Sequence, residues 1–264
     1  RGRDMVLAPT HEEVLSQIGK AYVQSYRDLP LIIYQIQTKF RDEPRPRAGL
    51  IRVREFDMKD AYSLDCDEKS LDENYRRMAL AYRNIYKRCG LPAIMVEADS
   101  GAIGGKDSHE FIQPVDTGED TIITCTNCDY AANLEKAVAN QPSIPHEALS
   151  LLEEIQTPGV TTITGLGEFL KIDRREILKS IMYVVDKDMV GVVIRGDLDV
   201  NDVKLGNVLS ARELRLADSD EIRSAGLIPG FISPVGITGL RWIGDNSIQL
   251  GQNFVAGGNK TDTH

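Results

Sequence analysis

The sequence predicts an α+β protein in two parts, an antiparallel sheet with flanking helices followed by a separate mixed α/β module. Residues 31–40 and 50–56 both have strand character, and the loop between them contains two prolines and Gly49, so they are predicted to pair as an antiparallel hairpin. After residue 150, helical and strand patterns begin to alternate, which indicates the second module. A chain of 264 residues has room for two domains.

Composition narrows the class of protein. The hydrophobic content of 42% is ordinary for a globular protein, no apolar run is long enough to span a bilayer, and no signal-peptide pattern is present. Four irregularly placed cysteines do not form a disulfide framework, so a reducing cytoplasm is expected. The net charge of −9 argues against wholesale coating of nucleic acid, so an RNA partner would have to be held by local basic patches. Because the chain begins with Arg1 and not Met, we expect a piece of a longer protein.

The predicted hairpin is strongly basic. Few acidic residues oppose its cations, which are Lys39, Arg41, Arg45, Arg47, Arg52 and Arg54. In the second strand, which is predicted to continue to residue 63, Arg52, Arg54 and Phe56 share one face. Arginine binds phosphate in a bidentate manner and an aromatic ring stacks on a purine, so the pattern suits a nucleoside polyphosphate. A solvated basic hairpin explains the pattern equally well when the residues are considered alone.

Three capping boxes predict helix starts: Thr10 with Glu13, Ser70 with Glu73, and Asp173 with Glu176. The third is expected to begin a helix that carries residues 177–182 and runs into a strand at 183–185. Further helices are predicted at 163–170 and around 201–209, and further strands at 189–197 and near Phe231 and Ile248.

Cys125 and Cys128 form a Cys-x-x-Cys pair, which raises the possibility of zinc. A structural zinc site needs four ligands, and the other two cysteines lie far upstream and singly. His109 and His146 are poorly spaced to complete a site. A turn at the end of a strand with two reduced thiols is therefore the favoured interpretation, with zinc as the alternative.

The run Phe40-Arg41-Asp42-Glu43, the Pro- and Arg-rich loop, and then Arg52 and Phe56 resembles motif 2 of class II aminoacyl-tRNA synthetases. The amino-acid sequence of residues 40–63 is similar to that of bacterial-type prolyl-tRNA synthetases, and the resemblance covers essentially the whole chain. It implies a partial class II synthetase antiparallel sheet followed by an inserted mixed α/β editing domain. The implied parts are a catalytic portion at 1–137, a linker at 138–150 and a C-terminally incomplete editing domain at 151–264.

The resemblance also implies residues for the synthetase site. For ATP they are Arg41, Glu43, Arg52 and Phe56, of which Arg41 and Glu43 also count as catalytic. For proline they are Thr10, Glu12, Met58, Asp60 and His109. The alternative for Met58 and Asp60 is ordinary sheet packing and a solvated carboxylate. We expect no catalytic base, because the carboxylate of the amino acid is itself the nucleophile on the α-phosphate.

For the editing pocket, the resemblance implies Lys179, Gly230, Pro234, Asp245 and His264, of which Lys179, Asp245 and His264 count as catalytic, with Lys179 on a helix. Without the resemblance, Lys179 would be interpreted as a solvated helix lysine and Asp245 as a turn residue. Editing has a physical reason, because lost methylene contacts discriminate alanine from proline by only roughly 1–3 kcal/mol each. No nucleophilic Ser or Cys stands out, so we expect direct attack by water on the ester.

The implied activity is ATP-dependent activation of proline and its transfer to tRNA(Pro), with hydrolysis of mischarged Ala-tRNA(Pro). ATP with Mg²⁺ is the expected substrate complex, with no tightly bound cofactor and no protein-bound metal. We expect a cytoplasmic homodimer for the full-length protein and no membrane partner. Motifs 1 and 3 and the anticodon domain are missing from this piece, so we expect that it cannot charge tRNA and that only the editing module works alone. The alternatives are a dedicated aminoacyl-tRNA deacylase and a non-catalytic synthetase paralogue that binds tRNA.

Overall fold

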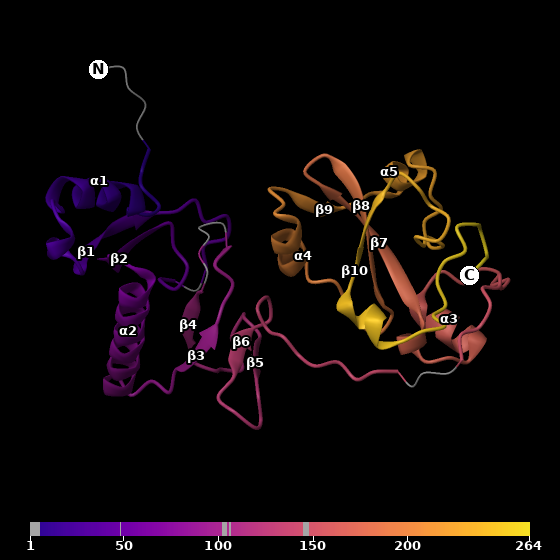
Figure 1. Cartoon of the computed structure of the whole chain (residues 1–264), viewed down its shortest axis with the longest axis horizontal. Helices are drawn as coiled ribbons and strands as arrows, with labels where there is room; N and C mark the ends of the chain where they lie inside the picture. The colour runs from indigo at the N-terminus through magenta and orange to yellow at the C-terminus, as the bar shows by residue number, and fades with distance from the viewer. Residues whose placement is uncertain (1–5, 48, 102–104, 106, 145–147) are drawn as a thin grey trace, which may run out of the picture. The chain divides into compact units, whose positions relative to one another are not determined.

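The computed structural model describes residues 6–47, 49–101, 105, 107–144 and 148–264. The chain divides into two compact units, residues 1–94 and 95–264, and each is considered by itself (Figure 1). Among the described residues, no helix is long and apolar enough to cross a membrane.

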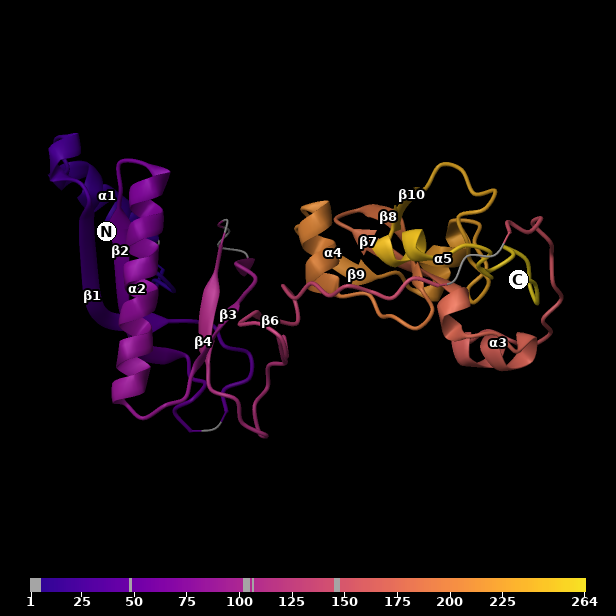
Figure 2. The ribbon, with the colours of Figure 1, turned by 60° about the horizontal axis from the view of Figure 1, so that its bottom comes forward.

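The first unit is built on one antiparallel pair of strands. β1 (Leu31–Phe40) and β2 (Glu55–Leu64) pair along their whole length, from Leu31 opposite Leu64 to Phe40 opposite Glu55. The helix α1 (Glu12–Tyr22) precedes them, followed by a short 3₁₀ helix η1 (Tyr26–Asp28), and α2 (Glu68–Arg88) comes after them (Figure 2). Gly19 lets α1 approach the end of β2, because a Cβ atom there would lie 2.9 Å from the Leu64 side chain.

Two of the predicted capping boxes are wrong. α1 begins at Glu12 with no side-chain cap, because the Thr10 hydroxyl donates to the Glu12 carboxylate and does not accept from the backbone. α2 begins at Glu68, where the Asp67 carboxylate accepts from the Ser70 N–H at 2.7 Å. A charged carboxylate is the stronger acceptor, so Asp67 caps the helix before Ser70 is reached.

The second predicted strand begins later than expected. β2 starts at Glu55, and before it only an isolated bridge joins Arg47 to Arg52. Pro44 and Pro46 have no N–H to donate, so the ladder does not continue into the loop. Arg52 and Arg54 therefore lie in the loop, and the strand face predicted for them is wrong.

The second unit contains two four-stranded sheets in its described part. The smaller has the order β4-β3-β6-β5, with β3 (Ile94–Glu97), β4 (His109–Ile112), β5 (Ile122–Thr124) and β6 (Ala131–Asn133). β5 and β6 are an antiparallel hairpin, and β6 runs parallel to β3. Val96, Ala98, Ala131 and Ala132 are buried in this sheet.

The larger sheet has the order β10-β8-β7-β9, with β7 (Leu178–Val185), β8 (Asp188–Arg195), β9 (Leu214–Leu216) and β10 (Arg241–Gly244). The helices of this module are α3 (Ile163–Leu170), α4 (Asp202–Leu209), α5 (Ser219–Ser224), η3 (Arg174–Glu176) and η4 (Asn246–Leu250). α4 and α5 lie on opposite sides of the sheet (Figure 1). Leu205 of α4 packs with Tyr183 and Val192, and Ile222 of α5 packs with the cluster of Met182 and Ile232.

The helix predicted for residues 177–182 is wrong. The capping box of Asp173 and Glu176 exists, but it caps only the three residues of η3. Residues 178–185 then alternate between two cores, with Tyr183 on the α4 side and Met182 on the α5 side. A residue period of two buries both faces of a central strand, and this packing overrides the helical signal.

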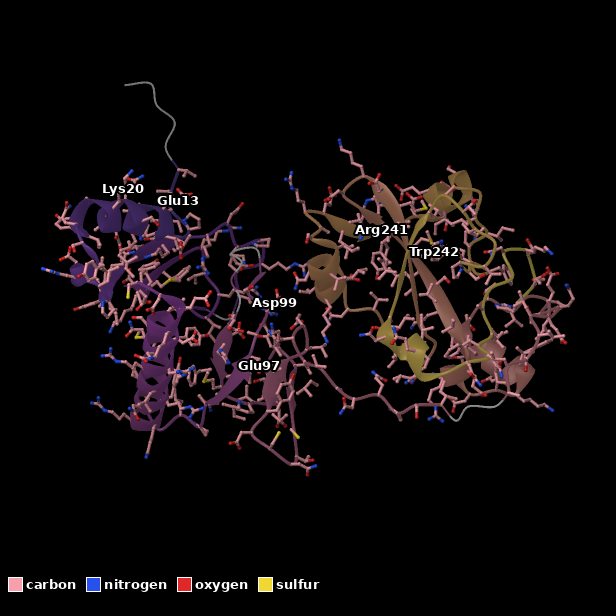
Figure 3. All side chains as sticks on the ribbon, viewed as in Figure 1. Glu13, Lys20, Glu97, Asp99, Arg241 and Trp242 are labelled. Atoms are coloured by element: carbon pink, nitrogen blue, oxygen red, sulfur yellow. The ribbon has the colours of Figure 1, made fainter. Side chains whose placement is uncertain are left out.

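The strands predicted near Phe231 and Ile248 are also wrong. Phe231 is buried in a loop, and Ile248 lies in η4. The strand of this region is β10, and its Trp242 (Figure 3) lies so close to Gly191 of β8 that a Cβ atom at Gly191 would come within 2.3 Å of the ring. Helices at 163–170 and 202–209 and a strand at 188–195 confirm the remaining predictions.

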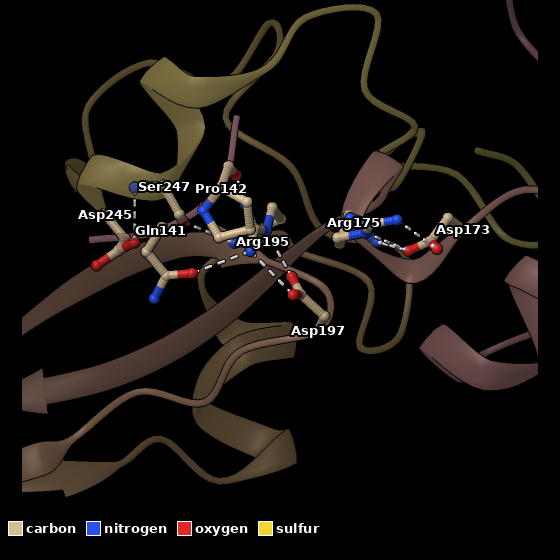
Figure 4. A network of polar contacts seen from close by, with 8 residues as sticks. All are labelled: Gln141, Pro142, Asp173, Arg175, Arg195, Asp197, Asp245 and Ser247. Carbon is tan, nitrogen blue, oxygen red and sulfur yellow. Dashed lines mark hydrogen bonds and ion pairs between the residues drawn. The ribbon is translucent and has the colours of Figure 1, made fainter. Parts of the chain in front are cut away.

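Part of the segment expected to be a linker is hydrogen-bonded to the second module. The Arg195 guanidinium donates to the Gln141 side chain at 3.0 Å and to the Pro142 carbonyl at 3.3 Å (Figure 4). The Ile144 N–H donates to the Leu250 carbonyl at 2.8 Å. Arg195 is 1% exposed and also forms two hydrogen bonds with Asp197, at 2.6 and 2.9 Å. A buried arginine therefore holds this segment to the end of β8.

Candidate functional site

One face of the β1–β2 pair carries three of the predicted site residues. The register places Phe56 opposite Lys39, Met58 opposite Gln37, and Asp60 opposite Gln35. Cross-strand partners point to the same side of a sheet, so Phe56, Met58 and Asp60 share a face. Lys39, which the sequence interpretation counted only among the basic residues of the hairpin, is completely buried there.

Asp60 is the centre of a polar network on this face. Its carboxylate accepts from Lys39 Nζ at 2.9 Å, from Gln35 Nε2 at 2.7 Å and from the Tyr62 hydroxyl at 2.5 Å. Burial disfavours the charged form, but the donors from Tyr62, Gln35 and Lys39 outweigh it and lower the pKa of Asp60 to about 2. Because these donors occupy both carboxylate oxygens, the geometry suits Asp60 to orienting its neighbours.

The network reaches the start of α1. Gln35 Nε2 also lies 2.8 Å from Nδ1 of His11, which stands between Thr10 and Glu12. Burial, the Asp60 hydrogen bond and the charges of Asp60 and Glu12 raise the pKa of Tyr62 to about 12, so its hydroxyl stays protonated. A neutral phenol beside the Glu12 carboxylate suits the binding of a cationic amine.

The predicted nucleotide residues are gathered in the loop before β2. The Glu43 carboxylate accepts from the Arg45 N–H and from Arg52 Nε, both at 3.0 Å, and these bonds lower its pKa. The Arg41 guanidinium carbon lies 5.4 Å from the centre of the Phe56 ring, within cation–π range. The structure therefore brings the four together as two contacting pairs. His109 lies half-buried on β4 in the second unit.

The second unit contains a cavity of about 140 Å³ that three predicted editing residues line. Lys179 comes from β7, Gly230 from the loop before Phe231, and His264 from the end of the chain. The other lining residues are Thr161, Thr162, Ile163, Leu166, Leu178, Ser180, Ile232 and Gly257. Side chains far apart in sequence thus form a small chamber whose lining is about equally polar and apolar.

His264 is firmly placed in this chamber. Its backbone pairs with Ile155 through hydrogen bonds of 2.7 and 3.0 Å, and its ring centre lies 5.4 Å from that of Phe231. Nδ1 of His264 lies 2.6 Å from the hydroxyl of Thr157, which is completely buried. Burial lowers the pKa of His264, so the imidazole favours its neutral form.

Lys179 and Gly230 have distinct local environments. Lys179 Nζ lies 2.6 Å from the carboxylate of Asp199, whose pKa this contact lowers. Gly230 has φ +91°, and a Cβ atom there would lie 3.3 Å from Thr161, so a side chain at this position would be strained. The backbone at Gly230 can therefore approach a ligand closely.

The remaining two predicted editing residues do not line the chamber. The Pro234 carbonyl accepts from the Ile237 N–H in the following turn. Asp245 caps η4 by accepting from the Ser247 N–H at 2.8 Å, and it lines a separate cavity of about 410 Å³. Asp199 also lines that cavity, so it lies between Lys179 and the region of Asp245.

The Cys-x-x-Cys pair lies in the turn between β5 and β6, and both thiols are free and exposed. The predicted strand-end turn is confirmed. Within the described ranges, no group of three or more His, Cys, Asp or Glu side chains that could hold a metal ion is found.

Comparison with known families accounts for both halves of the chain. Residues 1–150 match the model described as tRNA synthetase class II core domain (G, H, P, S and T). The chain belongs to the class II tRNA synthetase core family. Residues 157–264 match the model described as Aminoacyl-tRNA editing domain. The predicted fold class, a class II core fragment followed by a mixed α/β editing domain, is confirmed.

Curated relatives match along the whole chain. A protein named proline–tRNA ligase from Dehalococcoides mccartyi is 53% identical over 264 residues, which are 100% of this chain and 46% of that protein. Proteins of the same name from Caldicellulosiruptor saccharolyticus and Salinispora tropica are 49% identical over 264 residues and 44% identical over 273 residues, covering 99% and 100% of this chain and 46% of each relative. The chain spans about half the length of the curated relatives that it matches.

Several residues of these sites were not predicted from the sequence. Gln35 and Tyr62 join the class II core network through cross-strand contacts, and Thr157 reaches His264 across 107 positions of sequence. Period-two alternation placed Tyr62 on the face of Asp60, which was the one available signal. No local pattern pointed to Thr157, because a contact at that separation in sequence leaves none.

Proposed function

We propose that the protein to which this chain belongs is a proline–tRNA ligase with an editing activity. It uses ATP, as its Mg²⁺ complex, to convert proline to prolyl-adenylate, transfers proline to tRNA(Pro), and hydrolyses mischarged Ala-tRNA(Pro). The observation that carries the proposal is the joint occurrence of a class II core and an editing domain in a chain 44–53% identical to proteins named proline–tRNA ligase. The full-length protein is proposed to be a cytoplasmic homodimer.

In the activation step, an oxygen of the proline carboxylate attacks the α-phosphorus and pyrophosphate leaves, so no protein base is required. Arg41 and Arg52 supply guanidinium groups for the phosphates, and the Phe56 ring supplies a stacking face for adenine. The arrangement of Thr10, Glu12 and Tyr62 suits the imino group of proline. Met58 and His109 are each proposed to take part in binding proline.

We propose that Asp60 acts through others in this step. Its oxygens are engaged by Lys39, Gln35 and Tyr62. Loss of its charge would release the Tyr62 hydroxyl and, through Gln35, the His11 ring. Asp60 is therefore a positioning residue that keeps the start of α1 on the β1–β2 face.

In the editing step, water adds to the ester carbonyl, the bond to the terminal ribose breaks, and alanine and a free tRNA hydroxyl form. The chamber of about 140 Å³ has room for an alanyl group, and the pocket is proposed to exclude prolyl by size. The Lys179 ammonium attracts the 3′-terminal phosphate, and the backbone at Gly230 can stabilise the developing oxyanion. Neutral His264, held by Thr157, can accept a hydrogen bond from the attacking water. Pro234 and Asp245 are proposed to support this pocket from outside its lining.

Hydrolysis of Ala-tRNA(Pro) by this chain tests the editing part. Lys179→Ala is expected to lower the rate of this hydrolysis at least about tenfold, because it removes one positioned positive charge. Lys187→Ala is the matched control, since this exposed lysine lies in the turn at the other end of β7, and it should leave the rate unchanged. Absence of hydrolysis by the unsubstituted chain, or equal rates in both variants, contradicts the assignment.

Proline-dependent exchange of pyrophosphate into ATP by the full-length protein tests the synthetase part. Arg41→Ala should abolish the exchange while leaving hydrolysis of Ala-tRNA(Pro) intact. Exchange that proceeds equally with other amino acids would overturn the assignment of proline.

A further inference from the structure

The turn between β5 and β6 holds two thiols that neither proposed site uses. The hairpin closes with Thr124 opposite Ala131, and the Cys125 N–H donates to the Tyr130 carbonyl at 2.9 Å. Cys125 and Cys128 therefore lie on one short turn, and both are exposed. β6 is anchored to β3 through its buried residue Ala132, so the turn projects from a fixed base.

The two sulfur atoms have unequal surroundings. The Asn127 N–H donates to Cys125 Sγ at 3.4 Å. Donors aimed at a sulfur atom stabilise the thiolate relative to the thiol, so the Asn127 N–H, with the neighbouring Cys128, lowers the pKa of Cys125. Cys128 lies three residues after Cys125 within the same turn, which Thr124 and Ala131 close. The first cysteine thus has the character of an attacking thiolate, and the second lies where a resolving thiol must be.

We propose that Cys125 and Cys128 form a redox-active dithiol that reacts with low-molecular-weight disulfides such as glutathione disulfide. Cys125 attacks one sulfur of glutathione disulfide, the disulfide bond breaks, and one glutathione leaves. Cys128 then attacks Cys125 in the mixed disulfide, and the second glutathione leaves. Two protein thiols are oxidised to one disulfide, and one glutathione disulfide is reduced to two glutathiones, so atoms and electrons balance.

This site is independent of the proposed function, and the chain provides its own controls. Cys66 and Cys89 are also exposed free cysteines, but each stands alone in the first unit. If the turn has no special chemistry, all four thiols should react with glutathione disulfide at similar rates. If the turn is a dithiol, Cys125 should react first and end in an internal disulfide.

The test is a time course of the whole chain in glutathione disulfide, stopped by acid, alkylated, and analysed by intact mass and peptide mapping. The peptide that contains Cys125 and Cys128 should lose both thiols and two hydrogen atoms without retaining glutathione. Cys128→Ser should accumulate a mixed disulfide of glutathione at Cys125. Cys125→Ser should lower the rate at this peptide by about tenfold, toward the rates at Cys66 and Cys89.

Three results would overturn the proposal. One is equal reactivity of Cys125, Cys66 and Cys89, and another is a wild-type turn that keeps glutathione on Cys125. The third is a disulfide that joins two copies of the chain. Hydrogen exchange of residues 122–133 in each serine variant checks that the hairpin is retained, so that a lost reaction is not mistaken for a lost turn.

Discussion

Among the described residues, each unit contains one buried cation, and these two cations are satisfied in different ways. Lys39 in the first unit is 0% exposed and pairs with Asp60, whose carboxylate also binds Gln35 and Tyr62. Arg195 in the second unit is 1% exposed and forms a bidentate ion pair with Asp197. The network of Lys39 leads through Gln35 to His11, whereas that of Arg195 ends on the segment at 141–142.

The contrast follows from the chemistry of the two side chains. A guanidinium has several donors in a fixed plane. Arg195 can therefore donate to the Asp197 carboxylate and, with its other N–H groups, to the oxygens of Gln141 and Pro142. An ammonium is a point charge, and Lys39 leaves its carboxylate partner free to accept further donors. The arginine therefore holds backbone segments together, while the lysine supports a carboxylate that orients a candidate substrate site.

The largest expected effect comes from removing the buried arginine. Arg195→Met leaves Asp197 without its cation and the Pro142 carbonyl without a donor, which should lower the free energy of unfolding of the second unit by about 3–5 kcal/mol. Urea unfolding followed by fluorescence measures this unit selectively, because Trp242 is the only tryptophan of the chain. A loss below about 1 kcal/mol would show that Arg195 does not hold this unit together.

A smaller loss is expected at the buried lysine. Lys39→Met should lower the stability of the first unit by about 2–3 kcal/mol, because Gln35 and Tyr62 still donate to Asp60. Hydrogen exchange in peptides from β1 and β2 measures the effect. The double variant Lys39→Met/Asp60→Asn removes the unpaired charge and should recover at least half of the loss. If the double variant recovers none of the loss, the destabilisation by Lys39→Met does not come from the unpaired charge of Asp60.

Acid should weaken the lysine network specifically. The folded pKa of Asp60 is lowered from 3.8 to about 2, so its contribution is present above pH 3.8 and is lost as the pH falls through about 2. The full effect is about 2 kcal/mol. Exchange rates in β1, corrected for the intrinsic pH dependence, should rise over this range in the wild type and change less in Asp60→Asn. Identical pH profiles in the wild type and in Asp60→Asn would show that titration of Asp60 does not weaken this network.

The smallest effect is expected at Arg175, which provides the surface counterpart of Arg195 (Figure 4). Its pair with Asp173 has a comparable distance, 3.1 Å, but both side chains are about half exposed. Water and salt screen such a pair, so Arg175→Ala should leave the unfolding curve of Trp242 fluorescence unchanged. A loss as large as that of Arg195→Met would show that burial does not explain the difference between the two arginines.

Local patterns predicted much of the fold and failed where long-range packing competed with them. Strand 31–40 and the helices at 163–170 and 202–209 follow from residue periodicity alone. Residues 177–182 carried a helical signal after a real capping box, yet β8 and the two cores around Tyr183 and Met182 make them a strand. The cap at Asp67 was overlooked because Ser70 offered a competing capping pattern nearby.

The sequence by itself determined that the motif 2 residues Arg41, Glu43, Arg52 and Phe56 lie near one another, because they fall within a span of 16 residues. Such neighbours meet because the hairpin has little freedom to place them elsewhere. Only the tertiary structure decided that Lys179, Gly230 and His264 share a chamber, that Asp245 lines a different cavity, and that Thr157 holds the histidine. Those placements depend on strand register and on the burial of both faces of the larger sheet, which no local pattern encodes.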